Sequence, residues 1–217
     1  MKISVLTPSI RPLGLEIVRT SLLKQNFSDF EWLTEIGLGK HDLNSAYNRM
    51  LRRARGELVI SLQDYILVRP NFLTKWWDAY KKHPKAFITA PVGKVDNLNY
   101  SGEIKWDWRA YRNDENANIR PCEWNTWEID NGAAPLAALK EIGGFDEALD
   151  GHWSADNVNV GKRAQLAGYE FLCLFNNPAL AYNHDKFIEH PFRTDIDSTN
   201  TKRMAMFEGG MRLPPLH

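Results

Sequence analysis

The sequence predicts an α/β fold, in which crossover helices cover a parallel sheet. In residues 2–90, short apolar runs alternate with longer segments that have helical periodicity. Strands that alternate with helices are typical of a parallel sheet, because parallel neighbours need a crossover connection between them. Residues 186–217 show no clear period. We therefore expect a single domain that is followed by a C-terminal extension.

Local patterns support each element of the first half. Residues 2–7 form a β-branched run that Pro8 ends, as expected of a buried strand. Asp42 or Asn44 can cap a helix, and Gly56 is expected to stop it. Together these patterns predict strands over 2–7, 30–36, 57–62 and 86–90, and helices over 13–25, 42–55 and 70–82.

The second half has weaker periodicity. Residues 92–125 are polar, aromatic and rich in asparagine, with short strands expected near 103–111. The small residues at 131–134 either leave room for a ligand or mark a tight backbone contact. Beyond them, we expect helices over 135–142 and 156–168 and a strand over 170–174. We therefore expect one domain, residues 1–185, and an extension, residues 186–217. The extension would pack on the domain or close over a substrate as a lid.

The charge balance excludes some classes of protein. The chain has 217 residues with 27 basic and 27 acidic side chains, so its formal net charge is zero. Proteins that bind nucleic acids or membrane surfaces through bulk positive charge carry a basic excess. The sequence has no apolar run of membrane-span length and no signal-peptide pattern at its start. Cys122 and Cys173 lie far apart, which favours reduced thiols and a cytoplasmic protein.

Three segments that follow predicted strands are the first candidates for a ligand site. In open parallel sheets, ligands bind beyond the carboxyl ends of the strands. The candidates are Thr7, Pro8 and Ser9 after the first strand, Glu35 at the end of the second, and Gln63 and Asp64 after the third.

Asp64 is the best placed of these side chains for a metal. The sequence lacks both the GxGxxG and the GxxxxGK[ST] motifs, so glycine-rich phosphate loops are not expected. A divalent metal on a carboxylate is then the simplest partner for phosphate charge. His184 could be a second ligand, although a lone histidine is more often structural. The alternative for Asp64 is a turn aspartate that bonds its own backbone.

Two residues near the start of the helix at 156–168 are further candidates. Asp156 lies where exposed amides favour a carboxylate, so a simple N-cap would explain it as well as catalysis would. Trp153 lies three residues earlier and could offer a flat face to a sugar ring.

Four segments together resemble the family 2 glycosyltransferases, which have the GT-A fold. The resemblance covers about the first 185 residues, and the two C-terminal segments carry most of its specificity. The matching segments read ISVLTPSIRP, ARGELVISLQDYILVRPNFL, IGGFDEAL and WSADNVNVGKRAQLAGYEF. The resemblance implies a nucleotide-sugar-binding domain with a mixed, mostly parallel central sheet flanked by helices.

The resemblance also implies roles for single residues on the donor side. Asp64 would be the surviving member of the acidic metal motif, and His184 matches a later metal-ligating histidine of some relatives. The metal would be Mn²⁺ or Mg²⁺. The residues implied in donor binding are Thr7, Pro8 and Ser9 beside the nucleotide, Arg11 near its phosphates, Glu35 at the base, and Gln63 with Asp64.

On the acceptor side, Asp156 is the candidate for the base that accepts the proton of the acceptor hydroxyl. This residue matches the first member of the family's acidic pair, whereas Asn157 replaces the second member. The chain has eight tryptophans, several of them in its second half, where a saccharide needs flat apolar faces. Trp153, Asn157 and Trp127 are the residues that we expect to contact the acceptor.

The sequence therefore favours a metal-dependent enzyme of carbohydrate biosynthesis. It would move a sugar from a UDP-linked donor to a saccharide acceptor. The alternative is a degenerate GT-A domain that binds a nucleotide or a sugar without catalysis, since the metal motif is reduced to Gln63-Asp64-Tyr65 and position 157 is an asparagine.

Overall fold

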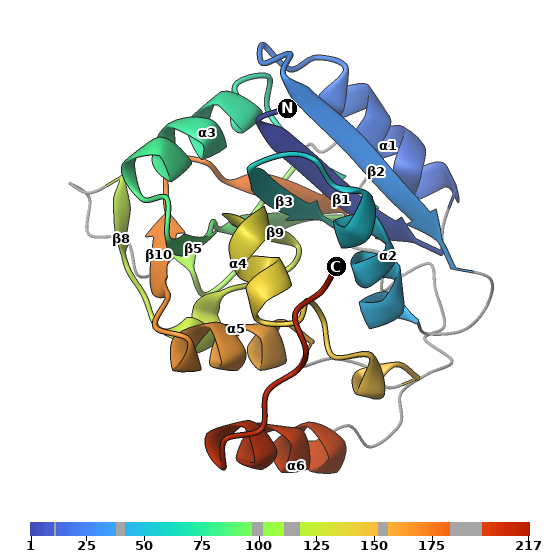
Figure 1. Ribbon diagram of the computed structural model, residues 1–217. Helices are drawn as coiled ribbons and strands as arrows, with labels where there is room; N and C mark the ends of the chain where they lie inside the picture. The colour runs from blue at the N-terminus through green and yellow to red at the C-terminus, as the bar shows by residue number, and fades with distance from the viewer. Residues whose placement is uncertain (11, 38–41, 97–101, 111–117, 152–155, 183–196) are drawn as a thin grey trace.

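A mixed sheet of seven strands forms the centre of the molecule. The computed structural model describes residues 1–10, 12–37, 42–96, 102–110, 118–151, 156–182 and 197–217 (Figure 1). The strand order is β2-β1-β3-β9-β5-β10-β8. Its strands are β1 (Ile3–Ser9), β2 (Phe30–Ile36), β3 (Leu58–Leu62), β5 (Ala86–Thr89), β8 (Ile119–Pro121), β9 (Asn131–Pro135) and β10 (Glu170–Leu174).

Most pairs within this sheet are parallel. Strand β1 pairs in parallel with β2 and β3, and β5 pairs in parallel with β10. Strand β9 runs antiparallel between β3 and β5, and β8 runs antiparallel at the edge. The mostly parallel mixed sheet predicted from the sequence is confirmed. The small residues at 131–134, for which no strand was predicted, form most of β9.

Helices cover both faces of this sheet, as Figure 1 shows. Because side chains alternate along a strand, Val5 and Ile60 meet one group of helices while Leu6 and Val59 meet the other. The first group is α1 (Pro12–Leu22) and α3 (Phe72–Lys82). The second is α2 (Leu43–Arg53), α4 (Leu136–Glu141) and α5 (Asp156–Leu166).

The chain also forms a second, smaller sheet of four strands. Its strand order is β4-β11-β6-β7. Strand β11 follows β10 along the chain and pairs with β4, which directly follows the Gln63 to Tyr65 segment. The strands are β4 (Ile66–Leu67), β6 (Val92–Val95), β7 (Lys105–Trp106) and β11 (Ala179–Tyr182).

Helix α2 begins and ends differently from the prediction. Its N-cap residue Asp42 makes no capping hydrogen bond with its side chain, which instead accepts a bond from Arg49. The helix ends at Arg53, where Ala54 is already extended, so Gly56 does not stop it. A Cβ on Gly56 would lie 2.4 Å from the backbone nitrogen of Ser4. The glycine is therefore required by the close approach to β1.

The C-terminal extension contains a helix that the sequence pattern did not predict. Helix α6 (Asp197–Glu208) lies below α5 in Figure 1. Phe207 is buried, and Arg203 donates two hydrogen bonds of 2.7 Å to Asp146. The chain then returns to α4, where the amide of Leu216 donates to the carbonyl of Lys140. The described part of the extension is packed on the domain, whereas the start of the expected lid, residues 186–196, lies outside the described residues.

Two general expectations can be compared with this fold. Trp76 is fully buried in the core, and Trp77 packs against it, as expected of tryptophans on a helix. Among the helices of the described segments, none has the length and apolar character that a membrane crossing requires.

Candidate active site

Asp64 is fixed at the carboxyl end of β3. Its carboxylate is buried and accepts a 2.6 Å hydrogen bond from the hydroxyl of Ser9, the last residue of β1. Strands β1 and β3 are parallel neighbours, so their ends bring these two predicted donor residues together. A Cβ on Gly14 would lie 2.1 Å from the carbonyl oxygen of Asp64. The start of α1 therefore packs directly on the Asp64 backbone and holds it in place.

The other predicted donor residues of this edge are engaged in local contacts. Thr7 is buried, and its hydroxyl accepts a 3.0 Å bond from the indole of Trp32. Pro8 belongs to β1 and lies in register with Glu35. The strand thus extends to Ser9, two residues beyond the predicted end. After β3, the hydroxyl of Tyr65 donates to the side-chain oxygen of Gln63.

Glu35 is paired with two guanidinium groups. Arg49 donates to one of its oxygens at 2.9 Å and Arg53 to the other at 2.6 Å. The two arginines are four residues apart on α2, so both lie on the helix face that approaches β2. That spacing was visible in the sequence, but the pairing with β2 was not. A nucleotide base at this edge would meet an ion pair and not a lone carboxylate.

Asp156 lies at the start of α5 and is nearly inaccessible. Its relative exposure is 4%, and one carboxylate oxygen accepts a 2.7 Å bond from the side-chain amide of Asn44 on α2. Burial is the main reason why the pKa of Asp156 is raised to about 7, and the charges of Asp150 and Asp146 add to the effect. The bond from Asn44 opposes them. A carboxyl group with this pKa can exchange a proton near neutral pH.

The charges of three carboxylates from separate parts of the chain act on the hydroxyl of Tyr47. It forms a hydrogen bond with the hydroxyl of Ser61 inside the core. Burial raises its pKa above the ordinary value, and the charges of Asp156, Asp130 and Asp64 raise it further. The fold therefore brings the predicted base and the predicted metal ligand into one region, together with Asp130, which the sequence did not single out.

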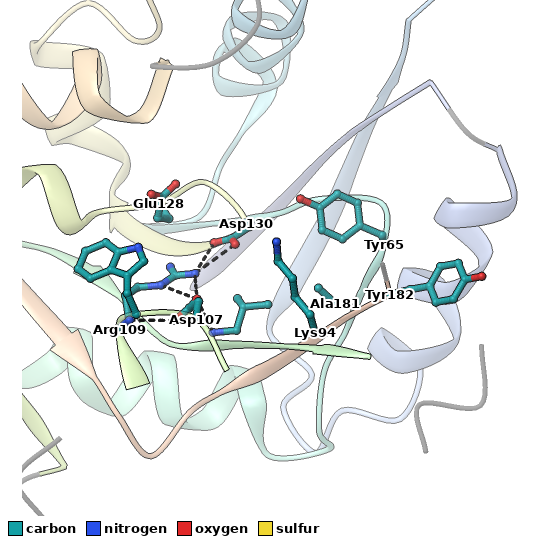
Figure 2. A pocket seen from close by; sticks show the side chains of 10 residues that line it. Tyr65, Lys94, Asp107, Arg109, Glu128, Asp130, Ala181 and Tyr182 are labelled. Atoms are coloured by element: carbon teal, nitrogen blue, oxygen red, sulfur yellow. Dashed lines mark hydrogen bonds and ion pairs between the residues drawn. The ribbon is translucent and has the colours of Figure 1, made fainter. Parts of the chain in front are cut away.

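A pocket of about 250 Å³ opens beside this region (Figure 2). It lies between the small sheet and the segment that precedes β9. Two tyrosines line it: Tyr65, which follows Asp64 in the sequence, and Tyr182, the last residue of β11. The lining side chains come from Tyr65, Val92, Lys94, Asp107, Trp108, Arg109, Glu128, Asp130, Ala181 and Tyr182.

Arg109 lines the pocket, and the dashed lines in Figure 2 join its side chain to Asp107 and Asp130. Its guanidinium group is 2% exposed and donates to Asp107 at 2.6 Å and to Asp130 at 3.0 Å. A third bond reaches the hydroxyl of Thr89 on β5. Burial opposes the charge of Arg109, but the two carboxylates outweigh burial and raise its pKa. The guanidinium group therefore links the two sheets and balances the negative charges of Asp107 and Asp130.

Glu128 is a pocket carboxylate that the sequence analysis missed. One of its oxygens accepts a 2.8 Å bond from the side-chain amide of Asn157, which also donates to the carbonyl of Trp127. Burial and the charges of Asp130 and Asp107 raise the pKa of Glu128 to about 8, against the opposing effect of Arg109. Position 157 is an amide, and this amide donates to the carboxyl group of Glu128. No sequence spacing connects positions 128 and 157.

Trp127, a predicted acceptor contact, is buried in the core. Its ring is 2% exposed, stacks edge to face on Phe87, and donates from its indole nitrogen to the carbonyl of Ala133. A Cβ on Gly132 would lie 2.1 Å from the carbonyl oxygen of Glu128. Of the two alternatives for residues 131–134, tight backbone contact is therefore the one that Gly132 supports.

Three predicted site residues, Arg11, Trp153 and His184, lie outside the described residues. Within the described residues, no group of three histidine, cysteine or acidic side chains is arranged to hold a metal ion. Asp64 remains the predicted metal ligand in the described part of the chain. Its oxygen suits a hard divalent cation, but a complete site would need ligands beyond the described side chains.

Comparisons with known proteins reveal likeness in structure only. The sequence matches no family model, and a search of curated proteins also finds no match. The fold is similar to S. aureus TarS 1–349 in complex with UDP-GlcNAc, with a TM-score of 0.65 and 15% identity over 96% of this chain and 72% of that one. It is also similar to GalNAc-T7 with UDP, GalNAc and Mn²⁺, with a TM-score of 0.68 and 12% identity over 95% of this chain and 48% of that one.

A longer S. aureus TarS chain gives a TM-score of 0.62 and 17% identity, over 84% of this chain and 37% of that one. The chain thus spans less than half the length of this TarS chain and of GalNAc-T7. At such identities the likeness shows the fold, and it confirms the GT-A fold predicted from the sequence.

Proposed function

We propose that this GT-A domain transfers a sugar from a UDP-linked donor to a saccharide acceptor, as a member of the family 2 glycosyltransferases. The observation that carries the proposal is that Asp64, Asp130 and Asp156 all lie close enough to Tyr47 for their charges to raise its pKa, and that Asp130 lines a pocket of about 250 Å³. The neighbouring structures support the donor class, since TarS 1–349 binds UDP-GlcNAc and GalNAc-T7 is in complex with UDP and GalNAc.

The donor would lie along the carboxyl ends of β1, β2 and β3. Thr7, Pro8 and Ser9 would border the nucleotide, with Arg11 near its phosphates. Glu35 would face the base as an ion pair with Arg49 and Arg53, so that side of the site offers guanidinium N–H donors as well. Ligand binding beyond the strand ends is the general rule for open α/β sheets.

Asp64 and His184 would hold a divalent metal, Mn²⁺ or Mg²⁺, together with oxygens of the donor diphosphate. GalNAc-T7 in complex with Mn²⁺ supports this choice. When bound, such an ion stabilises the negative charge that the leaving diphosphate gains. Ser9 fixes one oxygen of Asp64 by its 2.6 Å bond, which orients the carboxylate. Gln63 would stand beside the donor and accept the hydroxyl hydrogen of Tyr65.

Asp156 would accept the proton of the acceptor hydroxyl. As that O–H bond breaks, the acceptor oxygen forms a bond with the anomeric carbon of the donor. The bond between this carbon and the diphosphate oxygen breaks, and its electron pair leaves with the diphosphate. The pKa of Asp156, about 7, suits a base that works at neutral or slightly alkaline pH.

The acceptor would extend from the pocket beside Glu128 toward Asp156, since Glu128 is bonded to Asn157, the neighbour of Asp156. Hydroxyl groups of a saccharide can bond to carboxyl oxygens, and an exposed indole offers them a flat apolar face. Trp108 lines the pocket and is 43% exposed, so it suits this role better than the buried Trp127. Asn157 would position the carboxyl group of Glu128, to which it donates a hydrogen bond. Trp153 stays a predicted acceptor contact.

A second candidate function is binding without catalysis on the same fold. The residue at 157 is an amide, and the described residues include no cluster of three metal-ligating side chains. A domain of this kind would hold the nucleotide or the sugar without turnover.

Calorimetric titration with UDP, in the presence and absence of Mn²⁺ or Mg²⁺, tests the donor site, and a panel of UDP-sugars then tests turnover. We expect metal-dependent binding in the intact protein and at least a tenfold weaker metal effect in Asp64→Asn. Asp78→Asn, at an exposed position on α3, is the matched control. Binding of UDP without hydrolysis or transfer of any donor would favour the second candidate. Absence of UDP binding under all conditions would contradict the proposed transfer and would restrict the second candidate to a domain that holds a sugar.

A further inference from the structure

Asn44 lies buried between two carboxylates. It is the second residue of α2 and has no exposed surface. Its side-chain nitrogen Nδ2 donates to Oδ1 of Asp156 at 2.7 Å and to Oδ1 of Asp150 at 3.1 Å. One amide group thus joins the start of α2, the start of α5 and the residue that follows the 3-10 turn η3 (Glu147–Leu149).

Asp150 caps α2 from a distance of more than 100 residues along the chain. The backbone amides of Asn44 and Ser45 donate to its two oxygens at 2.8 and 3.1 Å, and the hydroxyl of Ser45 donates as well. These donors replace the capping bond that Asp42 does not make. A helix N-terminus favours a negative charge, so Asp150 presents a fixed carboxylate to its surroundings.

Asp156 faces several acidic groups in a nearly inaccessible place. Asp150 lies across the Asn44 amide, Asp146 precedes η3, and Tyr47 of α2 lies within electrostatic range. The charges of Asp150 and Asp146 both disfavour a charge on Asp156. The hydrogen bond from Asn44 is the side-chain contact that favours the charged form.

The orientation of the Asn44 amide follows from its two partners. Both partners are carboxylate oxygens, which accept hydrogen bonds, so Nδ2 and not Oδ1 must face them. Oδ1 is buried and has no hydrogen-bond partner within the described part of the chain. An amide that leaves its own oxygen unsatisfied while it serves two carboxylates is better suited to arranging those carboxylates than to stabilising the core.

We propose that Asn44 is a positioning residue that fixes Oδ1 of Asp156, separates it from Asp150 and leaves Oδ2 of Asp156 to accept the proton of the acceptor hydroxyl. The role of Asp156 as a base rests on the proposed function. The bridge between Asp150 and Asp156 does not, and it can be tested without any turnover.

The test is a carbon-13 NMR titration of the Asp156 carboxyl group in the intact protein and in two variants. Asn44→Ala removes the bridge but keeps the backbone amide that caps α2. Ser45→Ala is the matched control, because it removes a donor to Asp150 and leaves the bond to Asp156 in place. Asp156→Asn assigns the resonance. Thermal unfolding shows that each variant is folded, and Asn44→Ser replaces Asn44→Ala if that variant is not.

We expect Asp156 to bind its proton about tenfold more tightly in Asn44→Ala, a shift of about one pKa unit upward, and to change less than twofold in Ser45→Ala. The pH–rate profile of transfer should shift upward by the same amount in Asn44→Ala alone. Equal titrations of Asp156 in the intact protein and folded Asn44→Ala would overturn the proposal. An equal shift in both variants would overturn it too. If the intact protein transfers no sugar, the proposed function fails while the titration still decides the role of Asn44.

Discussion

The three carboxylates of the pocket differ in how their charge is compensated. Asp107 and Asp130 both accept hydrogen bonds from Arg109. Glu128 accepts its bond from the neutral amide of Asn157, and burial raises its pKa to about 8. The difference matters for stability, because a buried carboxyl group that must ionise without a bonded cation opposes folding.

Glu128→Gln should therefore stabilise the protein at alkaline pH. The pKa of Glu128 is raised in the folded state, so the folded protein keeps a proton that the unfolded chain loses. That contribution to stability is complete below about pH 4.5 and is lost as pH rises through about 8. We expect the variant to gain about 2–4 kcal/mol at pH 8.5 and almost nothing at pH 4.5. Urea unfolding at both pH values measures this.

The control for that comparison is Glu123→Gln, at an exposed position before the short turn at Trp124–Thr126. It should follow the pH dependence of the intact protein. A gain for Glu128→Gln that is the same at both pH values would contradict the raised pKa.

Two tryptophans near the pocket should respond in opposite ways to truncation. Trp127 is buried against Phe87, so Trp127→Ala should cost about 3–5 kcal/mol of unfolding free energy. Trp108 is 43% exposed, so Trp108→Ala should cost less than about 1 kcal/mol. With an acceptor identified, Trp108→Ala should raise its KM several-fold and leave kcat within twofold. Unchanged KM would exclude Trp108 from the acceptor site.

Elements of this chain are positioned by contacts that span long stretches of sequence. Helix α2 is capped by Asp150, and α6 is held by Arg203 on Asp146 and by Glu208 on Lys162 of α5. Asp146 in turn belongs to the turn before α5, where Asn159 also approaches it. The C-terminal helix therefore braces the part of the domain that carries Asp156.

Arg203→Ala should loosen α6 more than the rest of the domain. Loss of the two bonds to the buried Asp146 should cost about 2 kcal/mol, because it leaves that carboxylate without its cation. Hydrogen exchange should accelerate in α6 and in the turn at 146–149, while the amides of β1 and β3 keep their protection. Lys202→Ala, at an exposed neighbouring position, is the control. Uniform acceleration in all strands would show that α6 is not a separate bracing element.

The sequence patterns predicted most elements but not all. Strand β2 begins and ends at the predicted residues, and α3 and α5 agree with the prediction within two residues. Strand β9 was missed because Asn131, Gly132 and the two alanines that follow lack β-branched character, and its place is set by pairing with β3 and β5. Helix α6 was missed because, among its described side chains, Phe207 alone is buried, so no apolar period marks it.

At the scale of the molecule, the parallel pairing of β1, β2 and β3 was predictable, whereas the contacts of the site were not. Local patterns place Ser9 and Asp64 at neighbouring strand ends, and the structure joins them. The pairs of Asn157 with Glu128 and of Asn44 with Asp156 depend on how β9, α2 and α5 meet. No periodicity or motif in the sequence predicts those contacts. Glu128 and Asn44 can therefore be recognised as site residues only from the folded structure.

The central claim is that the site transfers a sugar, with Asp156 as the base. Its most direct test is the rate at which a labelled sugar moves from its UDP donor to a saccharide acceptor, measured for the intact protein and for Asp156→Asn at pH 8. We predict acceptor-dependent transfer by the intact protein and a loss of at least a hundredfold in the variant, with UDP affinity unchanged. Transfer at equal rates by both proteins, or no transfer from any UDP-sugar despite UDP binding, would contradict the claim.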